Sequence, residues 1–144
     1  KTARDGGHTA KALAAQVAQT ESELAASGNA DAQAVARRLK AARAAFVDVV
    51  DFVAGNTKAH PNDVFAGSVP YLMLAGNLMA GWQMGRALLV ALSPQAQAQD
   101  AAFMAAKVTT ARFYADHILS KAPGLRDSIV EGAGSVTAMA LDAF

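Results

Sequence analysis

The sequence contains no cysteine, which excludes disulfide scaffolds, thiolate metal sites and thiol nucleophiles. It also lacks an excess of charge of one sign, because 13 basic and 12 acidic side chains leave a net charge of +1. Proteins that bind phosphate backbones normally have a clear basic excess, so nucleic acid is not an expected partner. The opening residues lack a starting methionine and the apolar core of a signal peptide. We therefore expect a piece of a longer, cytoplasmic protein.

What the sequence does contain indicates helices within one domain. Its 144 residues have the size of a single ordinary domain, 53% are hydrophobic, and about a quarter are alanine. Glycine and proline fall in clusters that divide the chain into five segments, none of which has the period-two alternation of a strand. The segments are His8–Ala26, Asp31–Ala54, Ser68–Leu92, Ser93–Leu119 and a glycine-interrupted tail, Leu125–Phe144. They predict an all-α fold, an antiparallel bundle of four long helices plus a short helical C-terminal tail, with residues 1–144 as a single domain.

The second and fourth segments are amphipathic. In the second, apolar residues recur every three or four positions and form one stripe: Val35, Leu39, Ala42, Phe46, Val49 and Val53. Four charged residues lie off this stripe and are expected to face water: Arg38, Lys40, Asp48 and Asp51. In the fourth, one side is predicted to be buried: Met104, Val108, Ala111, Ala115 and Ile118. Ser93-Pro94 is a typical helix start, and Gly28 suits the left-handed position after the first helix.

A membrane span competes with the bundle core for the third segment. No charged residue occurs within Val64–Gly85, a run long enough to cross a bilayer, and Gly81–Gly85 has a GxxxG spacing. A proline, several polar residues and Arg86 argue against a span, and a helix that is apolar all round is also typical of a bundle centre. We therefore expect a buried central helix, with Tyr71 and Trp82 as core or interface anchors. Small residues would let neighbouring helices approach it: Ala75, Gly76, Ala80 and Gly81.

The titratable residues form no recognisable catalytic or metal-binding pattern. His8, His60 and His117 are far apart in sequence, and none has a second ligand at i+3 or i+4 on its helix face. Asp116 precedes His117 directly, so the two side chains point in different directions on a helix. Solvated or capping roles are therefore expected for these histidines, and no metal site is predicted.

The remaining candidate groups also have a structural interpretation. Glu21 and Glu23 lie two residues apart, which places them on different helix faces rather than together as acid and base. The amides of Asp5-Gly6-Gly7-His8 could meet an anion, but such a glycine pair more often only joins two helices. A basic group in the second segment is interpreted as solvated surface: Arg37, Arg38, Lys40 and Arg43. We predict no catalytic, cofactor-binding or metal-binding residue, so the chain alone is not expected to be an enzyme.

Three stretches in order nevertheless resemble a known family over nearly the whole chain. They are Ala66–Gly76, followed by Gly81-Trp82 and Arg86-Ala87; Phe103–Ala115, where the family typically reads Ala-Lys-x-x-x-Ala-Arg-Phe-Phe or -Tyr; and the ending Ala138–Phe144. This order and spacing resemble the extra C-terminal helical domain of large bacterial acyl-CoA dehydrogenases. The 3-methylmercaptopropionyl-CoA dehydrogenases are among the members that have this extension.

The resemblance implies a parent enzyme that uses FAD to oxidise the Cα–Cβ bond of an acyl-CoA thioester. In that family a glutamate in a Tyr-Glu-Gly-Thr segment removes the α-proton, and the flavin accepts the hydride. An Asp-Gly-Gly turn follows further along the chain, and Asp5-Gly6-Gly7 resembles it. The glutamate, the flavin-binding domain and the acyl-CoA pocket are therefore expected before Lys1, so that no catalytic residue and no bound FAD are expected in this fragment.

The resemblance also implies partners. The domain is expected to pack against the catalytic body of the same enzyme or against a second subunit in a homodimer. Two alternatives remain open, a stand-alone helical interaction module without an enzymatic parent and a bundle that associates with membranes. The residues before Lys1 distinguish the first alternative, and partitioning into liposomes distinguishes the second. The acyl chain length and the electron acceptor stay open.

Overall fold

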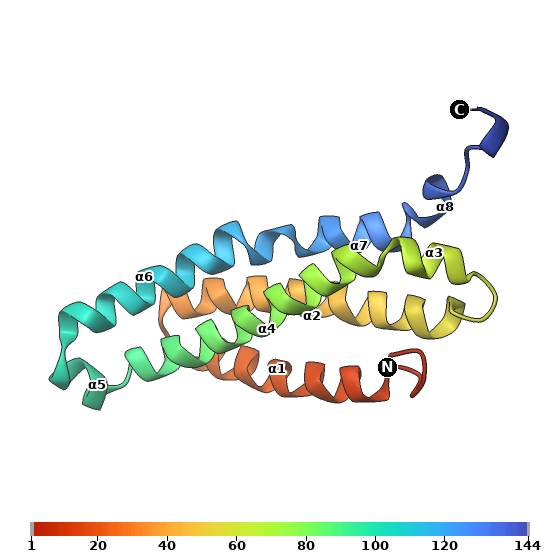
Figure 1. Ribbon diagram of the computed structural model, residues 1–144. Coiled ribbons are helices and arrows are strands. Elements are labelled where there is room, and N and C mark those ends of the chain that lie inside the picture. The colour runs from red at the N-terminus through yellow and green to blue at the C-terminus, as the bar shows by residue number, and fades with distance from the viewer. Residues whose placement is uncertain (1, 144) are drawn as a thin grey trace.

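The regular elements that the computed structural model describes, within residues 2–143, are all helical (Figure 1). The long helices are α1 (His8–Ala26), α2 (Ala30–Asn56), α4 (Ser68–Ala91) and α6 (Ala101–His117). Shorter elements join or extend them: α3 (Pro61–Ala66), α5 (Pro94–Gln99), the 3-10 turn η1 (Leu119–Lys121), α7 (Ala122–Val130), α8 (Ala133–Val136) and the 3-10 turn η2 (Leu141–Ala143). The predicted all-α class is confirmed.

The long helices lie lengthwise beside one another, and α7 continues the line of α6 (Figure 1). Helix α2 packs against α1, α4, α6 and α7. Helix α4 also packs against α1, α6 and α7, in addition to α2. The pair α2 and α4 therefore lies between α1 on one side and the α6–α7 arm on the other. Residues 134–143 are exposed and lead away from the bundle.

Helix α2 contains the apolar stripe predicted from its sequence. Asn29 caps its start, since the side-chain oxygen accepts hydrogen bonds from the amides of Asp31 and Ala32, both at 3.0 Å. The six stripe residues, from Val35 to Val53, are all buried, and each fully buried Val or Leu contributes about 1.5–3 kcal/mol relative to exposure. Arg38, Lys40, Asp48 and Asp51 are exposed, as expected.

The fourth predicted segment, Ser93–Leu119, is not one helix. It consists of α5 and α6, separated at Asp100, whose backbone is extended with φ −157° and ψ 87°. Two capping side chains explain the break: Ser93 Oγ accepts from the Ala96 amide at 3.3 Å, and Asp100 Oδ1 accepts from the Phe103 amide at 2.9 Å. Each cap starts its own helix, so the predicted bundle of four unbroken long helices needs this correction. Of the predicted buried side, Ala111 and Ala115 are fully buried.

The third segment is a helix, but it is not the buried centre that its sequence predicts. Helix α2 buries eleven residues against six in α4. Three exposed apolar side chains show the difference, since Val69, Leu72 and Val90 are 69%, 74% and 63% exposed. The physical reason is that the neighbouring helices cover only part of the circumference of α4, so an all-apolar helix leaves one apolar face uncovered.

The small residues of α4 divide between its two faces. A Cβ added to Gly81 would lie 2.6 Å from Leu119 Cδ2, so this glycine permits close packing inside the bundle. The same holds for Gly85, where an added Cβ would lie 3.0 Å from Leu24 Cδ1. Gly76 lies on the outer side and has no atom within 4 Å of an added Cβ. Sequence alone could not tell these glycines apart.

The two aromatic anchors predicted in α4 are half-buried and use their polar ends. Trp82 donates a hydrogen bond from Nε1 to Thr20 Oγ1 in α1 at 2.8 Å. The Tyr71 hydroxyl lies 3.0 Å from Thr2 Oγ1, which ties the start of the chain to the start of α4. Both side chains therefore fix the position of α4 relative to α1 and the N-terminal residues.

Candidate functional site

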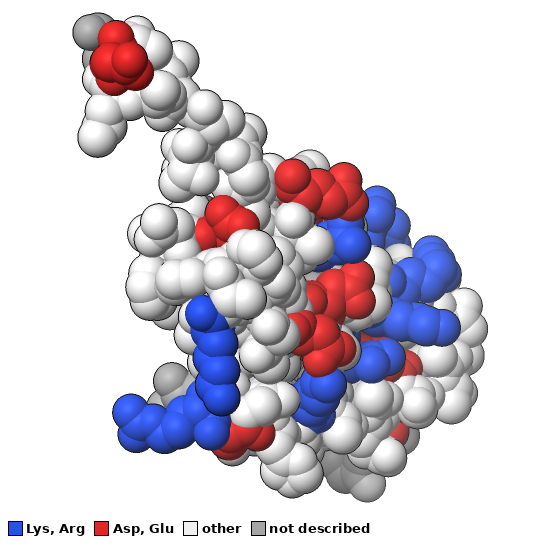
Figure 2. All heavy atoms as spheres, turned by 90° about the vertical axis from the view of Figure 1, so that its right-hand side faces the viewer, with Lys and Arg blue, Asp and Glu red and all other residues white. Residues whose placement is uncertain are grey.

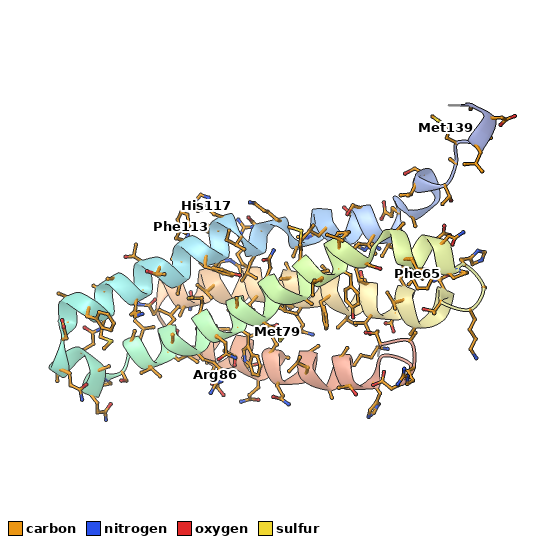
Figure 3. All side chains as sticks on the ribbon, in the orientation of Figure 1. Phe65, Met79, Arg86, Phe113, His117 and Met139 are labelled. Atoms are coloured by element: carbon orange, nitrogen blue, oxygen red, sulfur yellow. The ribbon has the colours of Figure 1, made fainter. Side chains whose placement is uncertain are left out.

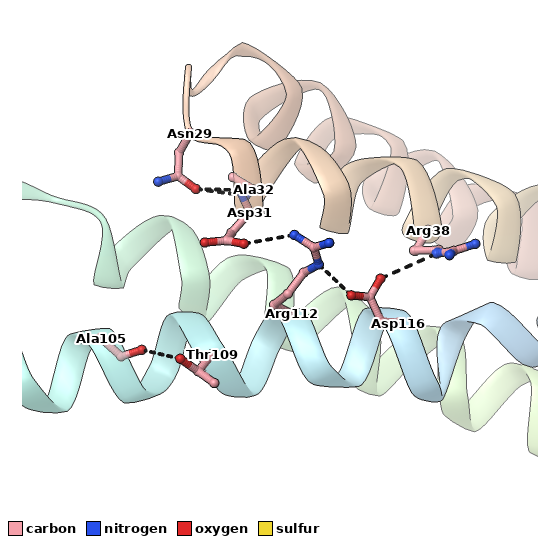
Figure 4. A network of polar contacts seen from close by, with 8 residues as sticks. All are labelled: Asn29, Asp31, Ala32, Arg38, Ala105, Thr109, Arg112 and Asp116. Atoms are coloured by element: carbon pink, nitrogen blue, oxygen red, sulfur yellow. Dashed lines mark hydrogen bonds and ion pairs between the residues drawn. The ribbon is translucent and has the colours of Figure 1, made fainter.

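Ion pairs connect the outer side of α2 to the α6–α7 arm and to α1. In the network of Figure 4, Arg112 of α6 donates from Nη1 to Asp31 Oδ1 at 2.9 Å and from Nε to Asp116 Oδ2 at 2.6 Å. Asp116 also lies 3.7 Å from Arg38 Nε. Two residues of α2, Arg38 and Asp31, and two of α6, Arg112 and Asp116, therefore form one chain of alternating charges. This arrangement fixes α6 against the first turns of α2.

Within this network, the pKa values of Asp116 and Arg112 are shifted in the directions that favour their charged forms. The hydrogen bond from Arg112 holds the pKa of Asp116 below its ordinary value of 3.8, with further charge effects of Arg112 and Arg38. In turn, the hydrogen bond to Asp116 raises the pKa of Arg112 further above its ordinary value. Asp116 and Arg112 therefore favour their charged forms, as a structural ion pair does.

A buried pair joins α1 and α2. Glu21 is 8% exposed and accepts two hydrogen bonds from Arg43, at 2.6 Å from Nε and 3.0 Å from Nη2. The carboxylate raises the pKa of the Arg43 guanidinium, mainly through these bonds. Glu23 lies on the exposed side of α1, so the two glutamates do face different directions. The doubly bonded carboxylate of Glu21 has a structural role.

Two further ion pairs complete the contacts around α2. Lys11 of α1 lies 2.5 Å from Asp51. Arg126 of α7 lies 3.4 Å from Asp48 and also pairs with Asp127 and Glu131 of its own segment. The three aspartates of α2, Asp31, Asp48 and Asp51, are thus each paired with a basic side chain of another helix.

Three members of the basic group line a groove between α1 and α2. Arg37, Lys40 and Arg43 lie along one wall, and the groove has a volume of about 560 Å³. Arg43 is neutralised there by Glu21, and Arg38 points to the other side of α2, toward Asp116. The interpretation as surface therefore holds for Arg37, Arg38 and Lys40. It does not hold for Arg43, which is partly buried and paired with Glu21.

In the turn Asp5–His8, considered above as an anion site, the Asp5 carboxylate itself binds the nearby backbone amides. Asp5 accepts from the amides of Gly7 at 3.0 Å and Thr9 at 3.1 Å, and Gly6 and Gly7 adopt the left-handed region with φ 63° and 82°. The side-chain hydrogen bond with Thr9 contributes most to lowering the pKa of Asp5. These residues form a helix-starting turn in which the amides of Gly7, His8 and Thr9 already have acceptors within the turn or the residues before it.

The histidines lie apart in the structure. His8 begins α1, His60 precedes α3, and His117 ends α6, where its ring centroid lies 4.5 Å from that of Phe113 with the two rings tilted by 35°. Figure 3 shows Phe113 and His117 projecting together from α6, away from the other helices. Within the described residues 2–143, no three His, Asp or Glu side chains are grouped as metal ligands.

The feature best suited to bind something outside this domain is the uncovered side of α4. Eight residues of this helix, spaced by three or four or directly adjacent, form what is called here the α4 face: Val69, Leu72, Met73, Gly76, Ala80, Gln83, Ala87 and Val90. None of them is charged, and Arg86 lies at its margin. Figure 2 looks along the bundle and shows the charged side chains crowded over the side away from α4, whereas the α4 side is mostly uncharged.

Apolar exposure continues beyond α4. Phe65 of α3 is 64% exposed near the start of the α4 face. In the C-terminal tail, Val136, Met139 and Leu141 are exposed as well, and Figure 3 shows Met139 well away from the bundle. Within residues 2–143, no helix combines the length and the apolar character needed to cross a membrane.

Sequence reasoning missed two features that the structure brings together. Glu21 lies four residues after Val17 and three before Leu24, which is the spacing of the buried face of α1. This position signals a buried carboxylate that needs a basic partner. The pairing of Arg112 with Asp31 spans 81 residues and has no local signal.

Two comparisons with known proteins find similarity to this chain. A family model described as "Acetyl-CoA dehydrogenase C-terminal like" matches residues 10–140. The chain is 41% identical over 141 residues to 3-methylmercaptopropionyl-CoA dehydrogenase of Ruegeria pomeroyi. The aligned region covers 98% of this chain but 24% of that protein, so the chain spans about a quarter of its relative. No solved structure gives a significant match.

Proposed function

Because this chain belongs to the acetyl-CoA dehydrogenase C-terminal-like family, we propose that it is the C-terminal helical domain of an FAD-dependent acyl-CoA dehydrogenase. The observation that supports this most is the asymmetry of coverage, with nearly all of this chain aligned to about a quarter of a dehydrogenase. The parent enzyme would oxidise the Cα–Cβ bond of an acyl-CoA thioester, and its FAD would accept the hydride.

In this proposal the domain itself serves packing rather than chemistry. Several of its ionised groups are engaged in structural pairs, as Glu21 and Asp116 show, and the amides of Gly7 and Thr9 already have the Asp5 carboxylate as their acceptor. Flavin chemistry needs a base beside the α-carbon and a cofactor held against the substrate. We therefore propose that both belong to the part of the parent that precedes Lys1.

The proposed partners are the catalytic body of the same enzyme and a second subunit. The exposed apolar residues of the uncharged α4 face support association with an apolar surface. In the absence of the body, we propose that two copies associate around a two-fold axis, which would pair the same surface with itself. We further propose that the parent enzyme resides in the cytoplasm, which fractionation of the native source can test.

The coding sequence upstream of Lys1 tests the proposed function. We expect it to encode a flavin-binding domain and a Tyr-Glu-Gly-Thr segment shortly before the present start. An upstream region without these features would favour a stand-alone helical interaction module. The longer protein, expressed from that sequence, is expected to contain FAD and to oxidise an acyl-CoA.

A further inference from the structure

The α4 face has large apolar side chains exposed to water. Leu72 is 74% exposed, Val69 69% and Met73 53%, and they occupy the first third of the helix on one side. Val90 is 63% exposed at the far end of the same face. Scattered exposed apolar residues are ordinary, but uncharged residues that follow one side of a 24-residue helix, with large apolar side chains at both ends, are typical of a contact surface.

Gly76 in the middle of this face gives an independent indication. It lies eight residues from the start of α4, where glycine weakens a helix relative to alanine. Gly81 and Gly85 are explained by Leu119 and Leu24, but a Cβ on Gly76 would meet no atom within 4 Å. The packing of this domain therefore gives no reason for glycine at position 76. A helix from outside, approaching the α4 backbone closely, would give one.

We propose that the α4 face docks onto the remainder of the same polypeptide, with an apolar helix of the catalytic body crossing α4 at Gly76. This inference rests on the proposed function, because the catalytic body is itself part of that proposal. The charges agree with an apolar partner: the ion pairs of the domain gather around α2, whereas the α4 face contributes only Gln83 as a polar side chain.

The size of the face favours a tethered partner over a second copy. A helix of 24 residues is about 36 Å long and about 10 Å wide, so its exposed strip covers roughly 360 Å². A stable complex of two separate chains buries about 800 Å² on each partner. A segment of the same polypeptide needs less contact area, because the tether supplies an effective concentration of about 1 mM. The relative is about four times as long as this chain, which leaves a large body to fill that role.

Thiol labelling of single positions tests the docking surface. This chain contains no cysteine, so Leu72→Cys reports on the α4 face and Ala44→Cys, on the exposed side of α2, is the matched control. Each variant is labelled at low micromolar concentration in this chain and in the longer protein, and the modified peptide is quantified by mass spectrometry. We expect Leu72→Cys to react at least ten-fold more slowly in the longer protein and Ala44→Cys to react equally in both.

A bulky residue at Gly76, the proposed crossing point, provides a second test of the docking surface. Gly76→Leu has room in this domain, so the midpoint temperature of the 144-residue chain should stay the same or rise by a few degrees. In the longer protein it should restore fast labelling of Leu72→Cys, whereas Ala44→Leu should not. A midpoint that falls in the short chain would contradict the assignment of open space at Gly76.

The outcomes separate this inference from the proposed function. Equal labelling of Leu72→Cys in both chains would overturn the docking surface, even if the longer protein oxidises acyl-CoA. Slow labelling already in the 144-residue chain would identify a second copy as the occupant and also overturn it. A longer protein that protects Leu72→Cys but neither binds FAD nor oxidises acyl-CoA would retain the docking surface and refute the proposed function.

Discussion

Arg43 holds Glu21 with two parallel hydrogen bonds across the contact between α1 and α2, at 2.6 Å and 3.0 Å. Of the ion pairs among the described residues, this one is the most buried, since the side chains of Glu21 and Arg43 are 9% and 25% exposed. A planar guanidinium and a carboxylate match each other in this bidentate form. The contact therefore fixes the register of the two helices as well as their distance.

Removing the charge of Glu21 should destabilise the domain. Glu21→Gln leaves the Arg43 guanidinium partly buried without its counter-charge, and we expect a loss of about 1–3 kcal/mol in the free energy of unfolding. Glu23→Gln makes the same change two residues away on the exposed side and should alter stability by less than about 0.5 kcal/mol. Urea unfolding of both variants measures the difference, and equal midpoints for the two would contradict the structural role of Glu21.

Asp116 should make stability depend on pH on the acid side. Its pKa in the folded state lies below the ordinary 3.8, so the folded protein favours the charged form. The stabilisation is therefore present at pH values above the ordinary pKa and is lost as pH falls through the lowered one. Asp116→Asn should reduce the shift in urea midpoint between about pH 6 and about pH 3, whereas Asp142→Asn in the exposed tail should not. An unchanged shift in Asp116→Asn would contradict the network of Figure 4.

Two alanine substitutions on α4 should change the stability of the domain in opposite directions. Gly81→Ala places a Cβ 2.6 Å from Leu119 Cδ2, and because Leu119 is 1% exposed its side chain cannot move aside freely. We expect a loss of about 1–3 kcal/mol in the free energy of unfolding. Gly76→Ala meets open space and should gain up to about 1 kcal/mol from helix propensity. Thermal unfolding distinguishes them, and a similar effect at both positions would refute the division of α4 into an inner and an outer face.

The sequence was sufficient for the helical class and for the buried stripe of α2, because three-and-four spacing reports directly on one helix face. It was not sufficient for α4, where an all-apolar pattern does not say which side is covered. Nor did it show the break at Asp100, since a capping aspartate competes with a strong helical pattern on both sides. The pairing of Arg112 with Asp31 depends on the approach of distant segments.

The uncovered α4 face should make the isolated chain self-associate weakly. We expect its average mass in sedimentation to rise with concentration from the monomer value of 14.8 kDa toward that of a two-fold dimer. Leu72→Glu places a charge on the face and should suppress this rise, whereas Ala44→Glu, on the exposed side of α2, should not. A constant monomer mass at the highest attainable concentration would contradict the expected association.

Flavin content and acyl-CoA oxidation should be measured side by side on this chain and on the protein extended by its natural upstream region. We expect no bound FAD and no turnover in the 144-residue chain, and about one FAD per chain with turnover in the extended protein. In the extended protein, changing the glutamate of the Tyr-Glu-Gly-Thr segment to glutamine should abolish turnover while FAD stays bound. Stoichiometric FAD or measurable turnover in the 144-residue chain alone would refute its assignment as a non-catalytic C-terminal domain, and so would an extended protein without either.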